Sequence, residues 1–161
     1  MTETNYIAQI SIEEHGLPIP TPEIEHERNL AIYDIIQKNE FSLDINFVKS
    51  AIKGPYALKL AIKNSLLRLL ITDQNSKVEY ELHLSLTALR PIIRDYFEVC
   101  NSYFNAVKRL PPSQIETIDM GRRGIHLEGS KALIERLDGK VRLDTPTAKR
   151  LFTLICALHF K

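Results

Sequence analysis

The stretch from Val78 to Val107 reads VEYELHLSLTALRPIIRDYFEVCNSYFNAV and contains the change of period that decides the fold. In its first half, apolar and polar residues alternate, which predicts a strand with one dry face and one wet face over 78–86. In its second half, the apolar residues recur every three or four positions, which predicts a long amphipathic helix over 89–107. We expect this helix to cover the dry face of the sheet to which the strand belongs.

Two alternating segments precede this stretch. Residues 56–62 and 67–71 each predict a strand, and Asn64-Ser65 between them offers a short turn. Together with 78–86 they predict an antiparallel meander. A further alternation, with Tyr6, Ala8, Ile10 and Ile12 on one face, predicts a separate strand near the start of the chain.

Three helix starts are marked by capping signals. Thr21 followed by Pro22 predicts an N-cap and first helical position, and the helix is expected to fray near Lys38. Ser113 and Glu116 have capping-box spacing and predict a helix that runs to about Leu137. Thr145-Pro146 repeats the first signal. Val141 and Leu143 predict a short strand, whereas residues 40–54 lack a clear period and are expected to form a loop that anchors Phe41 or Phe47.

The expected fold class is α+β, with a small antiparallel sheet of about four strands, including the central meander, packed against about four helices. At 161 residues the chain is expected to form a single globular domain over 1–161. The residues expected in its core are Ile10, Ile35, Leu60, Leu69, Leu82, Leu84, Ile93, Phe97, Cys100, Phe104, Leu133, Leu154 and Ile155.

The composition is that of an ordinary soluble protein, with 44% hydrophobic and 25% charged residues. No apolar run is long enough for a membrane span, and the start of the chain lacks the features of a signal peptide, so we expect a cytoplasmic protein and no membrane partner. The net charge of +1 is unevenly spread, because residues 1–40 carry eight acids and two bases whereas residues 108–161 carry six acids and eleven bases. Attraction between the two ends within one fold, or an anion-binding face in the last third, would each account for this.

The segment Gln114–Glu128 reads QIETIDMGRRGIHLE and combines glycines with ionisable residues inside a predicted helix. At helical spacing, Asp119 reaches Arg122 and Arg123, and both arginines reach His126. These residues, with Glu128, are the candidate ligand-binding or partner-binding set. An arginine fork suits a carboxylate or phosphate, and a nearby histidine adds a charge that can be switched.

The glycines of this region oppose helix formation. Gly121, Gly124 and Gly129 each cost roughly 1 kcal/mol relative to alanine in a helix interior. Either the helix breaks and one glycine adopts a positive φ, or another backbone packs too closely for a Cβ. A purely structural role, with glycines for packing and ordinary surface bonds for the arginines and His126, is the alternative to a binding site.

Glu25, His26, Glu27 and Arg28 form a secondary candidate set in the first turns of a helix. They fit either a solvated face or an acidic surface for a partner. The five histidines show no metal-ligand spacing, and no phosphate-binding, dinucleotide-binding or nucleophile motif occurs, so we expect no metal, no cofactor and no catalytic residue of a known type. Cys100 and Cys156 fall on apolar stripes and are expected to be buried thiols.

Several segments together resemble one family. They are Glu25–Arg28 with Ala31–Asp34, Gly54–Tyr56, Leu84–Thr87, Arg94–Phe97, Ser113–Gly124, His126 with Glu128 and Gly129, and Ala148–Cys156. Their combination, which spans nearly the whole chain, resembles a family of short alphaproteobacterial proteins of uncharacterised function. The resemblance implies a bacterial cytosolic source and supplies no activity, cofactor or site residue.

Three hypotheses of function follow. The first is a cytosolic protein-interaction or regulatory module whose working surface contains the arginines and histidine of 119–128. The second is a small enzyme or ligand-binding protein in which Arg122, Arg123 and His126 hold a small anion. The third, nucleic-acid binding through the basic last third, is disfavoured by the near-neutral net charge and by the lack of a cluster of basic residues.

Overall fold

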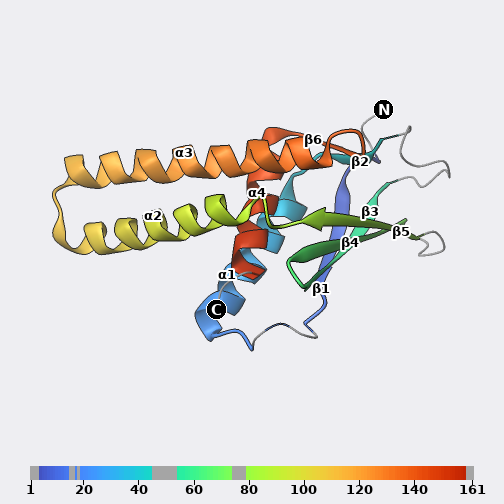
Figure 1. The fold of residues 1–161 in the computed structure, drawn as a ribbon, viewed down its shortest axis with the longest axis horizontal. Coiled ribbons are helices and arrows are strands. Elements are labelled where there is room, and N and C mark those ends of the chain that lie inside the picture. The colour runs from blue at the N-terminus through green and yellow to red at the C-terminus, as the bar shows by residue number, and fades with distance from the viewer. Residues whose placement is uncertain (1–3, 15–16, 18, 45–53, 74–78, 159–161) are drawn as a thin grey trace.

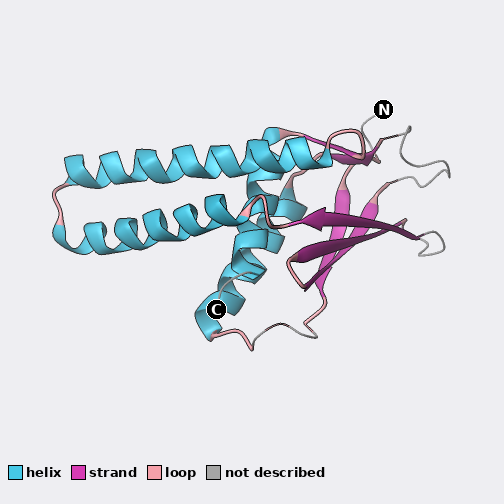
Figure 2. Cartoon of the chain, in the orientation of Figure 1, coloured by secondary structure: helices cyan, strands magenta, loops and turns pink. Residues whose placement is uncertain are grey.

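The computed structural model describes residues 4–14, 17, 19–44, 54–73 and 79–158 (Figure 1). Among these residues, runs of strands and runs of helices follow one another, which confirms the α+β class, and Figure 2 shows the strands gathered at one end of the molecule. The elements are β1 (Ile7–Ile12), α1 (Pro22–Gln37), β2 (Phe41–Leu43), β3 (Tyr56–Lys63), β4 (Leu66–Thr72), β5 (Glu79–Ser85), α2 (Arg90–Arg109), α3 (Pro112–Leu137), β6 (Val141–Leu143) and α4 (Thr145–Leu158).

The main sheet has the strand order β1-β3-β4-β5. The expected meander is confirmed, since β3, β4 and β5 pair antiparallel in sequence. Asn64 and Ser65 turn the chain between β3 and β4 with φ of 52° and 64°, the left-handed conformation that a two-residue hairpin turn requires. The sheet is mostly antiparallel, as predicted, but the antiparallel pairing does not extend to β1, which runs parallel to β3 and is joined to it by a connection that contains α1.

The first strand also buries a different residue from the one expected. The register of β1 against β3 shifts between Ile7 and Gln9, as at a β-bulge. Because an inserted residue moves the side chains that precede it to the other face, Ile7 is fully buried and Tyr6 is exposed. A uniform alternation that includes Tyr6 therefore fails at this point.

A second, two-stranded sheet joins distant parts of the chain. In it, β2 pairs antiparallel with β6, and Phe41 lies opposite Leu143. The predicted strand at 141–143 is confirmed, and the expectation of a loop throughout 40–54 is wrong for Phe41–Leu43. Phe41 is buried as an anchor against the Tyr56 ring, whereas Phe47 lies outside the described residues.

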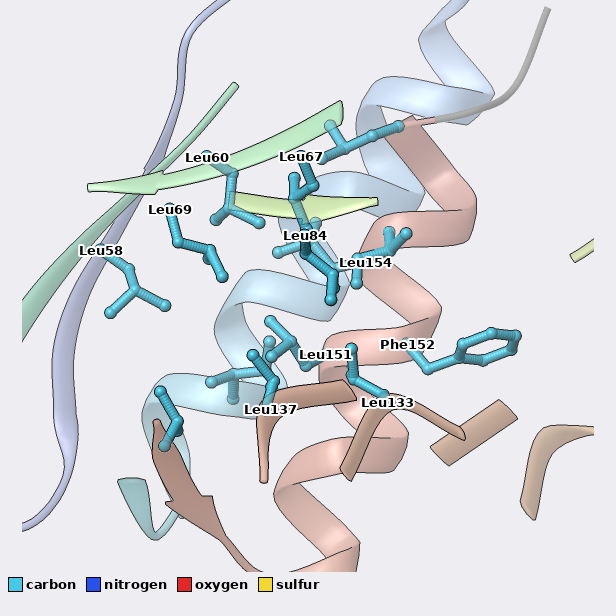
Figure 3. Close-up of a cluster of buried hydrophobic side chains, with 14 of the residues drawn as sticks. Leu58, Leu60, Leu67, Leu69, Leu84, Leu133, Leu137, Leu151, Phe152 and Leu154 are labelled. Carbon is cyan, nitrogen blue, oxygen red and sulfur yellow. The ribbon is translucent and has the colours of Figure 1, made fainter. Parts of the chain in front are cut away.

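The core lies between the main sheet and the helices α1, α3 and α4 (Figure 3). Figure 3 shows leucines of β3, β4 and β5 on one side and Leu133, Leu137, Leu151 and Leu154 on the other. In α4, nine of the 14 residues are buried, so this helix fills the centre of the core. Hydrophobic burial at this interface is the main stabilising contribution to the fold.

The helix α2 does not cover the sheet, which corrects the prediction made from its apolar stripe. Its stripe packs along α3, and the two helices form a hairpin that projects away from the sheet (Figure 1). Only Ile93 and Ala106 of α2 are buried, and Phe104, a residue predicted to lie in the core, is 59% exposed. We call the projecting part of the hairpin, residues 97–124, the arm.

The helix starts follow the capping signals in one case of three. The backbone N–H of Ile24 donates to Thr21 Oγ1 at 3.2 Å, which confirms Thr21 as an N-cap. The predicted capping box at Ser113 is wrong. The helix α3 begins one residue earlier, at Pro112, and its N-cap residue is Pro111. The last helix starts one residue earlier than expected, since Asp144 Oδ1 accepts from the N–H of Thr147 at 3.0 Å.

Candidate functional site

The glycine-arginine segment lies within one unbroken helix, α3. Inside it, Asp119 accepts from both arginines, as helical spacing predicts. Arg122 Nε donates to Asp119 Oδ1 at 3.0 Å and Arg122 Nη2 to the same oxygen at 2.5 Å, while Arg123 Nε lies 3.0 Å from Oδ2. The hydrogen bond from Arg122 lowers the pKa of the Asp119 carboxyl, so this group is ionised at neutral pH and engages both guanidinium groups.

The two arginines nevertheless face different surroundings. Arg122 crosses to α2, where its guanidinium carbon lies 5.0 Å from the centroid of the Tyr103 ring, a cation–π contact. The side chain of Arg123 is 64% exposed, whereas that of Arg122 is 31% exposed. Of the pair, Arg122 is the one placed between helices.

His126 is turned toward α4 and does not join the arginines. Its Nε2 lies 3.0 Å from the carbonyl oxygen of Lys149 and 2.8 Å from Thr153 Oγ1. Since a carbonyl oxygen can only accept, we assign the proton to Nε2. The ring stacks on Tyr96 at 5.3 Å, and burial lowers the pKa of His126 even though the hydrogen bond to Lys149 opposes the shift. A neutral imidazole thus joins α2, α3 and α4.

The three glycines of α3 have different surroundings. A Cβ on Gly129 would lie 2.6 Å from two carbons of the Phe152 ring, so this position requires glycine because of a close side chain. A Cβ on Gly121 would meet only Val99 at 3.9 Å, and one on Gly124 would have nothing within 4 Å. Of the two alternatives left open by the sequence, the helix break is absent, and a close approach, made by a side chain and not by backbone, explains Gly129 alone. Glu128, beside Gly129, is exposed.

The secondary candidate set is dispersed around α1. Glu25, His26 and Glu27 are exposed, whereas Arg28 is 4% exposed and its Nε has no hydrogen-bond partner among the described residues. Of the four, only Glu27 lines the cleft between α1, α2 and α4. The four residues do not form one site.

A cleft of about 700 Å³ lies in the angle between the arm and the body, where α1, α2 and α4 meet. Its volume is in the range of pockets that hold ligands or partner side chains. Most of its lining is apolar, and its charged groups are Glu27 and Asp34 from α1 and Arg122 from α3. The lining residues are Glu27, Leu30, Ala31, Asp34, Tyr96, Phe97, Cys100, Asn101, Tyr103, Phe104, Arg122, Thr153, Cys156 and Ala157.

Sequence reasoning found Glu27 and Arg122 as candidates but assigned Phe97 and Phe104 of the cleft lining to the core. The signal that could have revealed it is the length of the apolar stripe on α2. This stripe continues through Phe104 to Val107, where both side chains are exposed. A stripe longer than the surface available to bury it predicts an apolar face open to a partner.

Cys100 and Cys156 both line the cleft. Burial raises the pKa of Cys100 and that of Cys156, so both thiols are protonated at neutral pH. Among the described residues, no three His, Cys, Asp or Glu side chains are close enough together to hold a metal ion. In the same part of the chain, no helix is both long enough and apolar enough to cross a membrane.

Comparison with known proteins places this chain among uncharacterised relatives. A UPF0262 protein of Ruegeria pomeroyi is 54% identical over 154 residues, which cover 96% of this chain and 96% of that protein. A UPF0262 protein of Paracoccus denitrificans is 51% identical over 155 residues, covering 96% and 95% of the two chains. No solved structure matches. The model of the Uncharacterised protein family (UPF0262) matches residues 4–161, and the chain belongs to that family.

Proposed function

We propose that this protein is a single-domain, cytoplasmic protein-interaction module whose working surface is the cleft between the arm and the body. The observation that carries the proposal is an apolar wall left open to solvent: Phe104 is 59% exposed and Leu30 is 50% exposed on opposite sides of the cleft. Exposed apolar surface of this kind, rimmed by charged residues, is typical of binding sites for apolar groups of a partner.

The chemistry of the cleft favours binding over catalysis. A nucleophilic cysteine needs a lowered pKa, and the pKa of Cys100 is raised. His126, the base considered from the sequence, donates to the backbone of α4 and does not line the cleft. Arg122 contributes a positive charge that can orient an occupant, while Arg123 and Glu128 are exposed on α3 and do not line the cleft. Two free thiols also suit a reducing cytoplasm.

Site-specific photocrosslinking tests this proposal. Benzoylphenylalanine is introduced at Leu30 in the cleft, at Glu128 on the outer face of α3 and at Glu79 on β5, and each variant is irradiated in an alphaproteobacterial host. We expect discrete adducts from the Leu30 position and none from the Glu79 position. A second substitution, Phe104→Asp on the opposite wall, should abolish the Leu30 adducts while far-UV circular dichroism stays unchanged.

The outcomes separate the two candidate surfaces. Adducts from Glu128 alone would assign the interface to the glycine-arginine segment and overturn the cleft proposal. Adducts from Leu30 that persist in the Phe104→Asp variant would also contradict the cleft proposal, because a partner bound in the cleft must contact both walls.

Arg122 favours a second candidate, an amphipathic carboxylate held in the cleft. Its guanidinium lies at the edge of an apolar pocket, an arrangement that suits a fatty acid with its carboxylate on the arginine. Dodecanoate at 100 times its Kd should stabilise the fold by about 2.7 kcal/mol in a thermal-shift assay. Arg122→Gln should remove the shift, and Arg123→Gln, which also loses a bond to Asp119 but lies outside the cleft, should retain it. Equal shifts in both variants would exclude this ligand class at Arg122.

A further inference from the structure

The apolar wall of the cleft continues along α2 to the tip of the arm. Phe97, Asn101 and Phe104 line the cleft at intervals of four and three residues, and the same interval leads on to Val107 and Lys108. Val107 is 52% exposed. The arm therefore presents one surface in two parts, a proximal part inside the cleft and a distal part beyond it.

The opposite wall, on α1, presents acids around an apolar residue. Glu27, Leu30 and Asp34 are spaced by three and four residues, so they share one face of the helix, and all three are exposed. Neither carboxylate forms an ion pair among the described residues. The best complement to this wall is an occupant that carries apolar groups flanked by cations.

The tip of the arm has this chemistry. Val107 and Leu110 are exposed apolar residues, and Lys108 and Arg109 between them are exposed bases without an ion pair among the described residues. Within one molecule the tip cannot reach the wall that complements it, because the arm projects away from α1 (Figure 1). The tip of the arm and the α1 wall of the cleft cannot contact each other within one molecule, but they can do so between two copies of the chain.

We propose that the occupant of the cleft is the arm tip of a second copy of this chain, which rests on the proposal that the cleft binds a protein. In this dimer the two arms lie antiparallel about a two-fold axis, and each tip enters the cleft of the other copy. Lys108 and Arg109 of each copy face Glu27 and Asp34 of the other. A two-fold contact of this kind is made twice, so each complementary pair contributes twice.

The arrangement fixes what lies on the axis. The cleft is centred near Cys100 on α2, and the tip begins near Lys108, so the point midway between them lies at Phe104. Because a helix rises about 1.5 Å per residue, cleft and tip lie only about 12 Å apart along α2. In an antiparallel pair of arms, the two Phe104 side chains therefore meet.

Disulfide trapping tests the axis. In a Cys100→Ser background, Phe104→Cys is oxidised with diamide, which accepts the two electrons released when two thiols form a disulfide. We expect covalent dimers on non-reducing gels. Met120→Cys on α3 is the matched control, since Met120 is 63% exposed and Phe104 is 59% exposed. Equal trapping at both positions, or trapping at Met120 alone, would overturn the arrangement.

Charge reversal tests the pairing. Light scattering coupled to size-exclusion chromatography should give a dimer for the unmodified chain. Glu27→Lys with Asp34→Lys, and separately Lys108→Glu with Arg109→Glu, should each weaken dimerisation at least about tenfold, because like charges then face each other. Mixing the two double variants should restore a dimer, since every contact in the mixed pair again joins opposite charges.

The results also distinguish this inference from the proposed function. A monomer at all concentrations, or two double variants that remain dimeric, would overturn the second copy as the occupant. If the Leu30 crosslinks then contain a different protein, the proposed function stands without this inference. If Leu30 gives no adduct at all, both fail.

Discussion

Gly129 of α3 lies directly against the ring of Phe152 of α4. The ring is fully buried and also meets the Tyr96 ring edge-on at 5.8 Å and the His126 ring at 5.9 Å. Because glycine has no side chain, Phe152 can fill the space between three helices. The close packing of α3 on α4 at this point thus depends on the missing Cβ of Gly129.

Gly129→Ala should destabilise the protein by about 1–3 kcal/mol, the usual cost of adding a methyl group to a filled core. A new Cβ would lie 2.6 Å from two carbons of the Phe152 ring, which is fully buried. Gly124→Ala is the matched control, and it should stabilise the helix by about 1 kcal/mol because nothing obstructs the added methyl. Urea denaturation measures both, and equal effects of the same sign would contradict the packing described.

His126→Ala should destabilise the fold by about 1–3 kcal/mol, because the variant loses a hydrogen bond to the Lys149 carbonyl, a contact with Thr153 and a ring stack. Arg123→Ala, three residues away on the exposed side of the helix, should change stability by less than about 0.5 kcal/mol. Chemical denaturation compares the two. A neutral His126→Ala would mean that this residue is not the structural joint between α3 and α4.

Stability should fall when the pH drops below about 6.5, the ordinary pKa of histidine. Burial lowers the pKa of His126 in the folded state, so between the two values the unfolded chain binds a proton that the folded chain does not. The contribution of His126 is therefore complete above the unfolded pKa and is lost as the pH falls toward the folded one. Unfolding measured from pH 8 to pH 5 should show a shallower acid slope for His126→Gln, and parallel curves would refute the assignment.

The two thiols should differ in reactivity. Cys156 is 2% exposed and should resist iodoacetamide until the protein unfolds, whereas Cys100 lines the cleft and should react slowly. If a second copy covers the cleft, Phe104→Asp should speed the alkylation of Cys100 several-fold and leave Cys156 unreactive. Peptide mass spectrometry follows both thiols in one sample. An unchanged rate at Cys100 would show that Phe104 does not control access to it.

The spacing of apolar residues along the sequence predicts which segments form helices and strands better than it predicts which of these elements pack against one another. The meander and the last helix were expected from alternation and from the recurrence of apolar residues, both of which report burial directly. The stripe on α2 equally reports burial, but it does not say whether a sheet or another helix buries it. The parallel pairing of β1 depends on a long connection, and β2 is only three residues long, so neither leaves a pattern in the sequence.

The candidate site was predictable to the extent that it is local. The ion pairs of Asp119 with Arg122 and Arg123 follow from helical spacing. The position of His126 against α4 depends on how helices that are distant in the sequence pack together. The same is true of Arg122, which lines a cleft formed with α1, α2 and α4. Spacing along one helix contains no information on that packing.

The burial of α4 has a consequence for how the protein is made. Residues 145–158 leave the ribosome after every strand of the sheet that they cover, and they supply Leu151 and Leu154 to its leucine-lined face. Until α4 follows, the leucines of that face lack the contacts that Leu151 and Leu154 supply, and exposed apolar surface of this kind makes an incomplete chain prone to aggregation.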